Sequence, residues 1–161
     1  MSNKWVVNAS PLILLAKVEH IHLLQKLTEQ LVIPANVATE VQGGPPGDPA
    51  RVWLNGEGAA WIRREIETVP SVAAWDLGAG ETAVLSWAHK NKEFEAIIDD
   101  RAARKCAVIE QIAVRGTLGV IFAAKVRGLI PRAQPLCEAI VRAGLRLHPR
   151  LLREALKLVG E

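Results

Sequence analysis

Residues 95–107 read EAIIDDRAARKCA, a short apolar stretch that ends in two aspartates and continues into a helical pattern. The apolar and β-branched residues of 95–98 predict a buried strand that stops at Asp99 and Asp100. The spacing of apolar residues after the aspartates predicts a helix over 101–114. A strand followed directly by a helix is the repeating unit of an α/β protein.

Two other short apolar stretches are also followed by helical patterns. KWVVN (4–8) precedes Ser10 and Pro11, which we expect to be the N-cap and first residue of a helix reaching Leu27. LVI (31–33) precedes the helical pattern PANVATEV. Strands that alternate with helices predict a parallel sheet, and such sheets bind ligands at the carboxyl ends of their strands.

Glycine- and proline-rich breaks divide the rest of the chain, and GGPPGDP (43–49) is the strongest of them. We expect one domain over residues 1–161, with the C-terminal helices of about 133–160 as an extension. The remaining predicted elements are a short helix at 50–57, a strand at 60–66 and helices at 76–92, 116–128, 133–143 and 149–159.

Composition and charge limit the classes of protein. Half of the residues are apolar and 23% are charged, which is typical of a globular protein. No apolar run is long enough to span a membrane, no signal peptide is evident, and the two cysteines form no CxxC pair, so we expect a cytoplasmic protein. Residues 1–100 hold 8 Lys/Arg and 13 Asp/Glu, whereas residues 101–161 hold 12 Lys/Arg and 4 Asp/Glu. This asymmetry fits either an acidic centre beside a phosphate-attracting surface or solvated basic helix faces.

Carboxylates at strand ends and in first helical turns are the main chemical signal. They are Glu40, Glu81, Asp99 and Asp100. Singly, each has an ordinary explanation, because a Glu in the first turn suits the helix dipole and an Asp after a strand is a common N-cap. Clustered carboxylates, however, repel one another unless a cation neutralises them, and oxygen ligands suit Mg²⁺ or Mn²⁺.

Five segments fall in the order and spacing of PIN domains: VVNASPLILLAKV, LVIPANVATEV, LGAGETAVLSWA, IIDDRAARKCA and RGTLGVIFAAKVRGLIP. Over about residues 4–160 the chain resembles a VapC-like subgroup long catalogued as a domain of unknown function. The resemblance implies a three-layer α/β/α sandwich with a central parallel sheet. It also implies a metal-dependent ribonuclease, often the toxin of a toxin–antitoxin pair, that holds one or two Mg²⁺ or Mn²⁺ ions.

The resemblance also assigns site residues. Glu40 matches the second acid of the family, Glu81 the acid of the central helix, and Asp99 or Asp100 the acid after the later strand. We favour Asp100 as the closer metal ligand, with Asp99 supporting it or capping a helix. Asn8 stands where PIN domains usually have an aspartate; its oxygen can ligate a cation, but one negative charge is lost.

Several residues are expected to support the site. Ser10 matches a small hydroxyl position that supports the metal in this family. Arg101, Arg104 and Lys105 share one side of the helix after the aspartates and are expected to hold the RNA backbone; equally, Arg104 is a candidate to pair with a site carboxylate. Thr117 opens a helix, where it either binds phosphate or serves as an ordinary N-cap.

The expected partners are an RNA substrate, a small cognate antitoxin and a second copy of the chain. Apolar residues of the last helix offer a candidate dimer surface, or they pack on their own sheet. The competing hypothesis is a PIN-like RNA-binding module whose catalysis is weakened or lost because of Asn8. A nucleotide-binding α/β domain is a third possibility, but the chain lacks a phosphate-binding loop.

Overall fold

The computed structural model describes residues 3–161. Its centre is a five-stranded sheet in which every strand pairs in parallel with its neighbours, in the order β3-β2-β1-β4-β5. The strands are β1 (Lys4–Val7), β2 (Gln30–Pro34), β3 (Ile62–Arg63), β4 (Phe94–Ile97) and β5 (Val114–Arg115).

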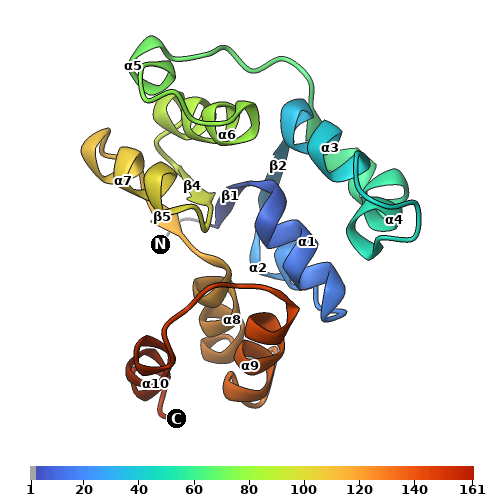
Figure 1. Cartoon of the computed structure of the whole chain (residues 1–161), viewed down its shortest axis with the longest axis vertical. Helices are drawn as coiled ribbons and strands as arrows, with labels where there is room; N and C mark the ends of the chain where they lie inside the picture. Colours follow the sequence, from blue (N-terminus) through green and yellow to red (C-terminus); the bar gives the residue numbers. More distant parts are fainter. Residues whose placement is uncertain (1–2) are drawn as a thin grey trace.

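Helices cover both faces of this sheet, so the predicted three-layer α/β/α sandwich is confirmed (Figure 1). One layer consists of α5 (Pro70–Ala73), α6 (Ala79–Lys90) and α7 (Arg101–Ile109). The other contains α1 (Ala9–Lys17), α2 (Leu23–Leu27), α8 (Thr117–Val126) and α9 (Gln134–Ala143). The remaining helices are α3 (Ala35–Gln42), α4 (Pro49–Asn55), the 3-10 turn η1 (Glu57–Trp61) and α10 (Pro149–Lys157).

The connections reverse direction beside the central strand, and this reversal fixes where a ligand can bind. The chain runs from β1 outward to β2 and β3, and then returns through α6 to β4 on the other side of β1. The helices that follow β1 and β4, α1 and α7, therefore lie on opposite faces of the sheet. A crevice outside the carboxyl ends of such a strand pair is the usual binding place in open parallel sheets.

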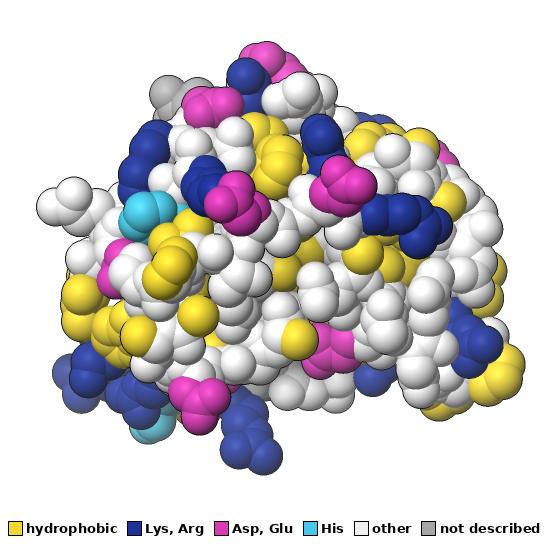
Figure 2. Space-filling model, turned by 90° about the horizontal axis from the view of Figure 1, so that it is seen from above, with side chains coloured by type: hydrophobic (Ala, Val, Ile, Leu, Met, Phe, Trp, Pro, Cys, Tyr) yellow, Lys and Arg dark blue, Asp and Glu magenta, His cyan; other side chains and the backbone are white. Residues whose placement is uncertain are grey.

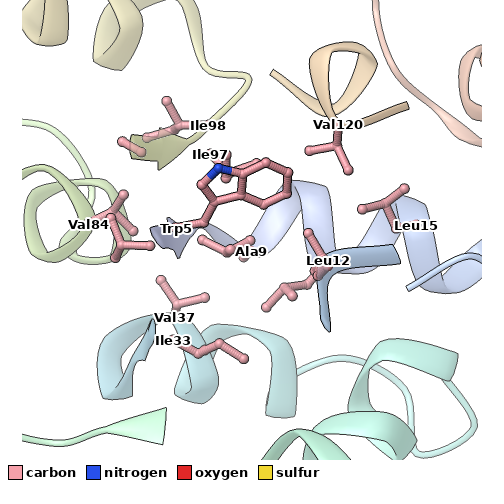
Figure 3. Close-up of a cluster of buried hydrophobic side chains, with 14 of the residues drawn as sticks. Trp5, Ala9, Leu12, Leu15, Ile33, Val37, Val84, Ile97, Ile98 and Val120 are labelled. Carbon is pink, nitrogen blue, oxygen red and sulfur yellow. The ribbon is translucent and has the colours of Figure 1, made fainter. Parts of the chain in front are cut away.

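The core lies between the sheet and its helices, around the indole of Trp5 (Figure 3). Trp5 is 3% exposed, as expected from its place in the predicted strand, and Leu12, Leu15 and Val120 surround it from α1 and α8. Burying one such aliphatic side chain contributes about 1.5–3 kcal/mol, so this cluster fixes α1 and α8 against the sheet.

The predicted helix reaching Leu27 is wrong in two respects. It begins at Ala9 with Asn8 as the N-cap residue, so Ser10 lies in the first turn and is not the cap. It also breaks after Lys17, because Glu19 adopts the left-handed conformation with φ 60° and the His20 ring contacts the Val18 carbonyl. A separate short helix, α2, then leads into β2.

The predicted helix over 101–114 is also too long, since α7 ends at Ile109. Gln111 turns the chain with φ 58°, and Val114 and Arg115 form the edge strand β5 beside β4. The predicted strand at 60–66 shrinks to the two residues of β3 behind η1. Strands of two residues are too short for periodicity to reveal, so only pairing with a neighbour identifies them.

The C-terminal part ends in α10, which follows the extended segment 144–148. The glycines that precede or follow its helices, Gly128, Gly144 and Gly160, all have positive φ, as expected for helix ends. Leu156 of α10 is buried within the chain, whereas Leu151 and Leu158 are 56% and 88% exposed. Across residues 3–161 the structure has no helix with the length and apolar character needed to cross a membrane.

Candidate metal centre

The candidate site lies where β1 and β4 end, at the reversal of the sheet. The Asn8 N–H donates to the Ile97 carbonyl at 3.0 Å, which holds the two strand ends side by side. Asp99 follows β4 by two residues, and α3, after β2, brings Glu40 to the same cleft. Residues that are far apart in the sequence therefore line one cleft at this edge of the sheet.

Asn8 supplies an oxygen that no protein group satisfies. The residue is 4% exposed, and its Oδ1 has no hydrogen-bond partner among the described residues. An unsatisfied buried acceptor costs roughly 1–3 kcal/mol, so a protein retains one mainly where something else binds it. A cation or a water in the cleft would satisfy this oxygen.

Gly80 in α6 leaves the space in front of this oxygen open. A Cβ placed on Gly80 would lie 3.1 Å from Glu40 Oε2 and 3.2 Å from Asn8 Oδ1. Both oxygens therefore face the same glycine, and a larger residue would intrude between them and the cleft. Sequence reasoning missed Gly80, although its place one residue before Glu81 in GAGE was a usable signal.

Glu40 and Glu81 approach each other across the cleft and repel. Partial burial raises the pKa of the Glu40 carboxyl above its ordinary value, and the nearby Glu81 carboxylate raises it further. Glu81 lies in the first turn of α6, where the helix dipole favours its charge. A divalent cation between the two carboxylates would relieve their repulsion.

Asp99 is held by three donors from two elements. Its Oδ1 accepts from the Thr117 N–H at 2.8 Å, and its Oδ2 accepts from the Thr117 hydroxyl at 2.6 Å and the Ser10 hydroxyl at 3.3 Å. Thr117 is fully buried, and both of its donors point to Asp99. Gly116 is the N-cap residue of α8, so the expected N-cap role of Thr117 is wrong. Phosphate binding by Thr117 stays a prediction, and in the structure both of its donors orient Asp99, in agreement with a supporting role.

Asp100 has a different role in the structure. Its carboxylate accepts from the Ala103 N–H at 2.9 Å and so caps α7, while Asp99 reaches α8. Asp100 also lines the cleft and is more exposed than Asp99. The expected preference for Asp100 as metal ligand stays a prediction, and the hydrogen-bond pattern favours Asp99 in its place.

The basic residues of α7 separate into different environments. Arg104 donates to the Ile98 carbonyl at 3.2 Å, and its guanidinium reaches the space over Gly116 beside Asp99. Arg101 lines the cleft and is exposed, whereas Lys105 is exposed outside the cleft lining. The structure thus places two of the three predicted RNA-binding residues at the site.

The lining of this cleft provides side-chain oxygen atoms that could bind a cation. Among residues 3–161, no three Asp, Glu, His or Cys side chains come close enough together to form a ready metal site. Asn8 is an amide and is not among those residue types, yet its free oxygen joins the Glu40–Glu81 pair as a third oxygen donor. All-oxygen donor sets of this kind suit Mg²⁺ or Mn²⁺, so the residues present fit such an ion.

The fold and the cleft together define a parallel α/β/α protein with an acidic, cation-suited site at its topological reversal. A family model described as a PIN domain matches residues 4–161. The chain therefore belongs to the PIN-domain family, which generally includes metal-dependent nucleases. No curated protein matches the chain closely enough to count as a relative.

Proposed function

We propose that this chain is a metal-dependent endoribonuclease that hydrolyses RNA phosphodiester bonds with Mg²⁺ or Mn²⁺. The observation that supports it most strongly is the unpartnered, buried Oδ1 of Asn8 beside Glu40, in front of the open space at Gly80. Membership of a family of metal-dependent nucleases supports the reaction class. We further propose a VapC-like toxin role, with a small antitoxin and a homodimer as partners, on the resemblance alone.

The contacts of these residues support the following proposed roles. Asn8, Glu40, Glu81 and Asp99 would hold the ion, and Ser10 and Thr117 would orient Asp99 by donating to it. When bound, the ion supplies an activated water and stabilises charge on the leaving oxygen. Arg101, at the rim of the same cleft, is placed to contact a phosphate.

The test is cleavage of a mixed pool of structured RNAs with Mn²⁺, with Mg²⁺ and with EDTA. We expect cuts only with a divalent ion, and we expect Glu81→Gln to reduce the rate by about 100-fold or more, equivalent to roughly 2.7 kcal/mol of lost transition-state stabilisation. Glu65→Gln is the matched control, since Glu65 is exposed and does not line the cleft. Equal rates for the two variants would show that Glu81 is not in the active site.

Asn8 supports a second candidate, a PIN-like module that binds RNA without cleaving it. Replacing the usual aspartate removes one negative charge from the donor set, which weakens cation binding. This candidate predicts salt-sensitive RNA binding without cleavage, and restoration of cleavage in Asn8→Asp. If wild-type protein cuts RNA as fast as Asn8→Asp, the module hypothesis is excluded.

A further inference from the structure

The cleft that contains the carboxylates continues well beyond them. It runs past β5 and α8 to the segment 144–148 and the start of α10, with a volume of about 1400 Å³. Pockets for small molecules usually measure roughly 300–1,000 Å³, so this cleft is large enough for part of a polymer. The distal end is built by the C-terminal extension, away from the carboxylates of the metal site.

The floor of the distal part is apolar. Phe122 and Leu118 of α8 line it, together with Leu145 and Leu147 of the extended segment. All four are partly buried, so each still presents some surface to the cleft. Along 145–148 the burial alternates, which turns the two leucines inward and leaves Arg146 and His148 exposed.

The rim of the distal part is basic and not neutralised. Arg146 has no hydrogen bond or ion pair with any other residue in the described range 3–161, and it lines the cleft beside His148. His148 Nδ1 accepts from the Arg150 N–H at 3.1 Å, so in the neutral ring the proton is on Nε2, which is free to donate. By contrast, Arg115 at the middle of the cleft is already paired with Glu95 at 2.9 Å.

The face seen from the side of α5 and α6 has a different character, because acidic and basic side chains are mixed on it (Figure 2). Four arginines, and no acidic residue, occur between positions 142 and 153. Of these arginines Arg146 lines the cleft, and no acidic side chain of 142–153 offsets it, so charge complementarity favours a polyanion at the distal cleft over an acidic or purely apolar partner.

We propose that the distal cleft is a binding subsite for single-stranded RNA that flanks the scissile phosphate. Bases lie on the floor formed by Phe122, Leu145 and Leu147, and a backbone phosphate is bound by Arg146. Unstacked bases expose faces that pack on aromatic and apolar side chains, whereas a duplex hides them and offers mainly its backbone. This inference rests on the proposed function for the identity of its ligand, but not on catalysis.

The test measures binding in EDTA, where cleavage does not contribute. Fluorescence anisotropy would compare a labelled single-stranded 12-nucleotide RNA with the same sequence in a duplex, for wild-type protein and for Arg146→Ala, Phe122→Leu and Arg153→Ala. Arg153 is the matched control, because it is an exposed arginine of α10 outside the cleft lining. Circular dichroism would verify that each variant is folded.

We expect Arg146→Ala to weaken single-strand binding by about tenfold and to reduce the slope of log affinity against log salt by about 0.7. Phe122→Leu should weaken binding while leaving the slope unchanged, since it removes stacking and no charge. Arg146→Ala behaving like Arg153→Ala, or a duplex binding as tightly as the single strand, would overturn the inference. The inference would also be overturned if the wild-type protein did not bind RNA even at low salt. A protein segment would then be the alternative occupant of the distal cleft.

The outcomes separate this inference from the proposed function. Binding that depends on Arg146, with no cleavage under any divalent ion, would retain the subsite and reject the nuclease. Metal-dependent cleavage that Glu81→Gln abolishes, with binding insensitive to Arg146, would retain the nuclease and reject the subsite.

Discussion

At the scale of single residues, the site depends on space as much as on charge. Gly80 has no side chain, and this lets Asn8 Oδ1 and Glu40 Oε2 face the same open volume. In a helix, alanine is normally preferred to glycine by about 1 kcal/mol, so glycine at this position of α6 costs stability in exchange for access.

We expect Gly80→Ala to weaken Mn²⁺ binding by about tenfold or more, because the new Cβ would lie within 3.2 Å of both oxygens. The thermal midpoint of the metal-free protein should fall little, since the gain in helix propensity offsets part of the crowding. Isothermal titration calorimetry measures the Mn²⁺ affinity, and differential scanning calorimetry measures the thermal midpoint of the metal-free protein.

Gly47→Ala is the control for this experiment. A Cβ on Gly47 meets no atom within 4 Å, and the residue lies in the loop before α4, outside the cleft lining. If Gly80→Ala binds Mn²⁺ as well as Gly47→Ala does, the ion is not held between Asn8 and Glu40.

At the scale of elements, the sequence predicted the strands that a local apolar pattern marks. It did not predict elements that depend on pairing with a neighbour or on the conformation of one residue. The strands at 4–8, 31–33 and 95–98 were predictable because runs of buried apolar residues form each of them. β5 was not predictable, since two residues leave no period and only the contact with β4 makes them a strand. The break after Lys17 was missed for a similar reason, because a single left-handed Glu19 interrupts an apolar pattern that otherwise continues.

A carboxylate just beyond α10 helps the buried Leu156 to fix the last helix to the body of the molecule. Glu161 accepts from the Ala133 and Gln134 N–H groups at 2.6 and 3.0 Å, at the start of α9. Lys125 Nζ lies 3.2 Å from the same carboxylate, whose side chain is 6% exposed. The backbone donors and Lys125 lower the pKa of Glu161 to about 2.

The depressed pKa predicts the pH range in which α10 loosens. An acid whose pKa is lower in the folded protein stabilises it above the ordinary value, here 4.5, and loses that contribution as the pH falls to about 2. We expect Glu161→Gln to increase proteolysis and hydrogen exchange in α10 at pH 7, and the difference from wild type to shrink between pH 4.5 and 2.

Hydrogen exchange resolved by peptide distinguishes this local effect from global unfolding, and Glu154→Gln in the middle of α10 is the control. Within residues 3–161, Arg150 is the polar partner of the Glu154 side chain, in an exposed pair one helical turn apart. Identical exchange in wild type and Glu161→Gln at pH 7 would mean that this carboxylate does not hold the helix.

At the scale of the whole molecule, the sheet gathers residues from distant parts of the chain into one cleft. The meeting of Asn8 and Asp99 was predictable, because a parallel sheet aligns its carboxyl ends. Glu40 and Glu81 lie within helices, and the family resemblance assigned them to the same site. The different roles of Asp99 and Asp100 were not predictable from the sequence. They depend on which helix N-terminus each side chain reaches in three dimensions. The role of Thr117 as a donor to a residue 18 positions earlier was hidden for the same reason.

A cation that binds only the folded molecule must raise its thermal midpoint. At a Mn²⁺ concentration about 100 times the dissociation constant, the stabilisation is roughly 2.7 kcal/mol. For a chain of this size that corresponds to an increase of about 5–11 °C, which EDTA should reverse. Differential scanning fluorimetry measures it, and Glu40→Gln should lose the increase; a full increase in that variant would exclude Glu40 as a ligand.

The bond between the Thr117 amide and Asp99 Oδ1 also gives the cleft a built-in spectroscopic label. That N–H lies on the backbone at the start of α8, and it donates at 2.8 Å to the carboxylate that we expect to ligate the ion. Withdrawal of electron density from Asp99 by a bound cation would shift the proton resonance of this one amide. A single assigned peak in a ¹⁵N correlation spectrum can thus report occupancy of the site without any substrate being known.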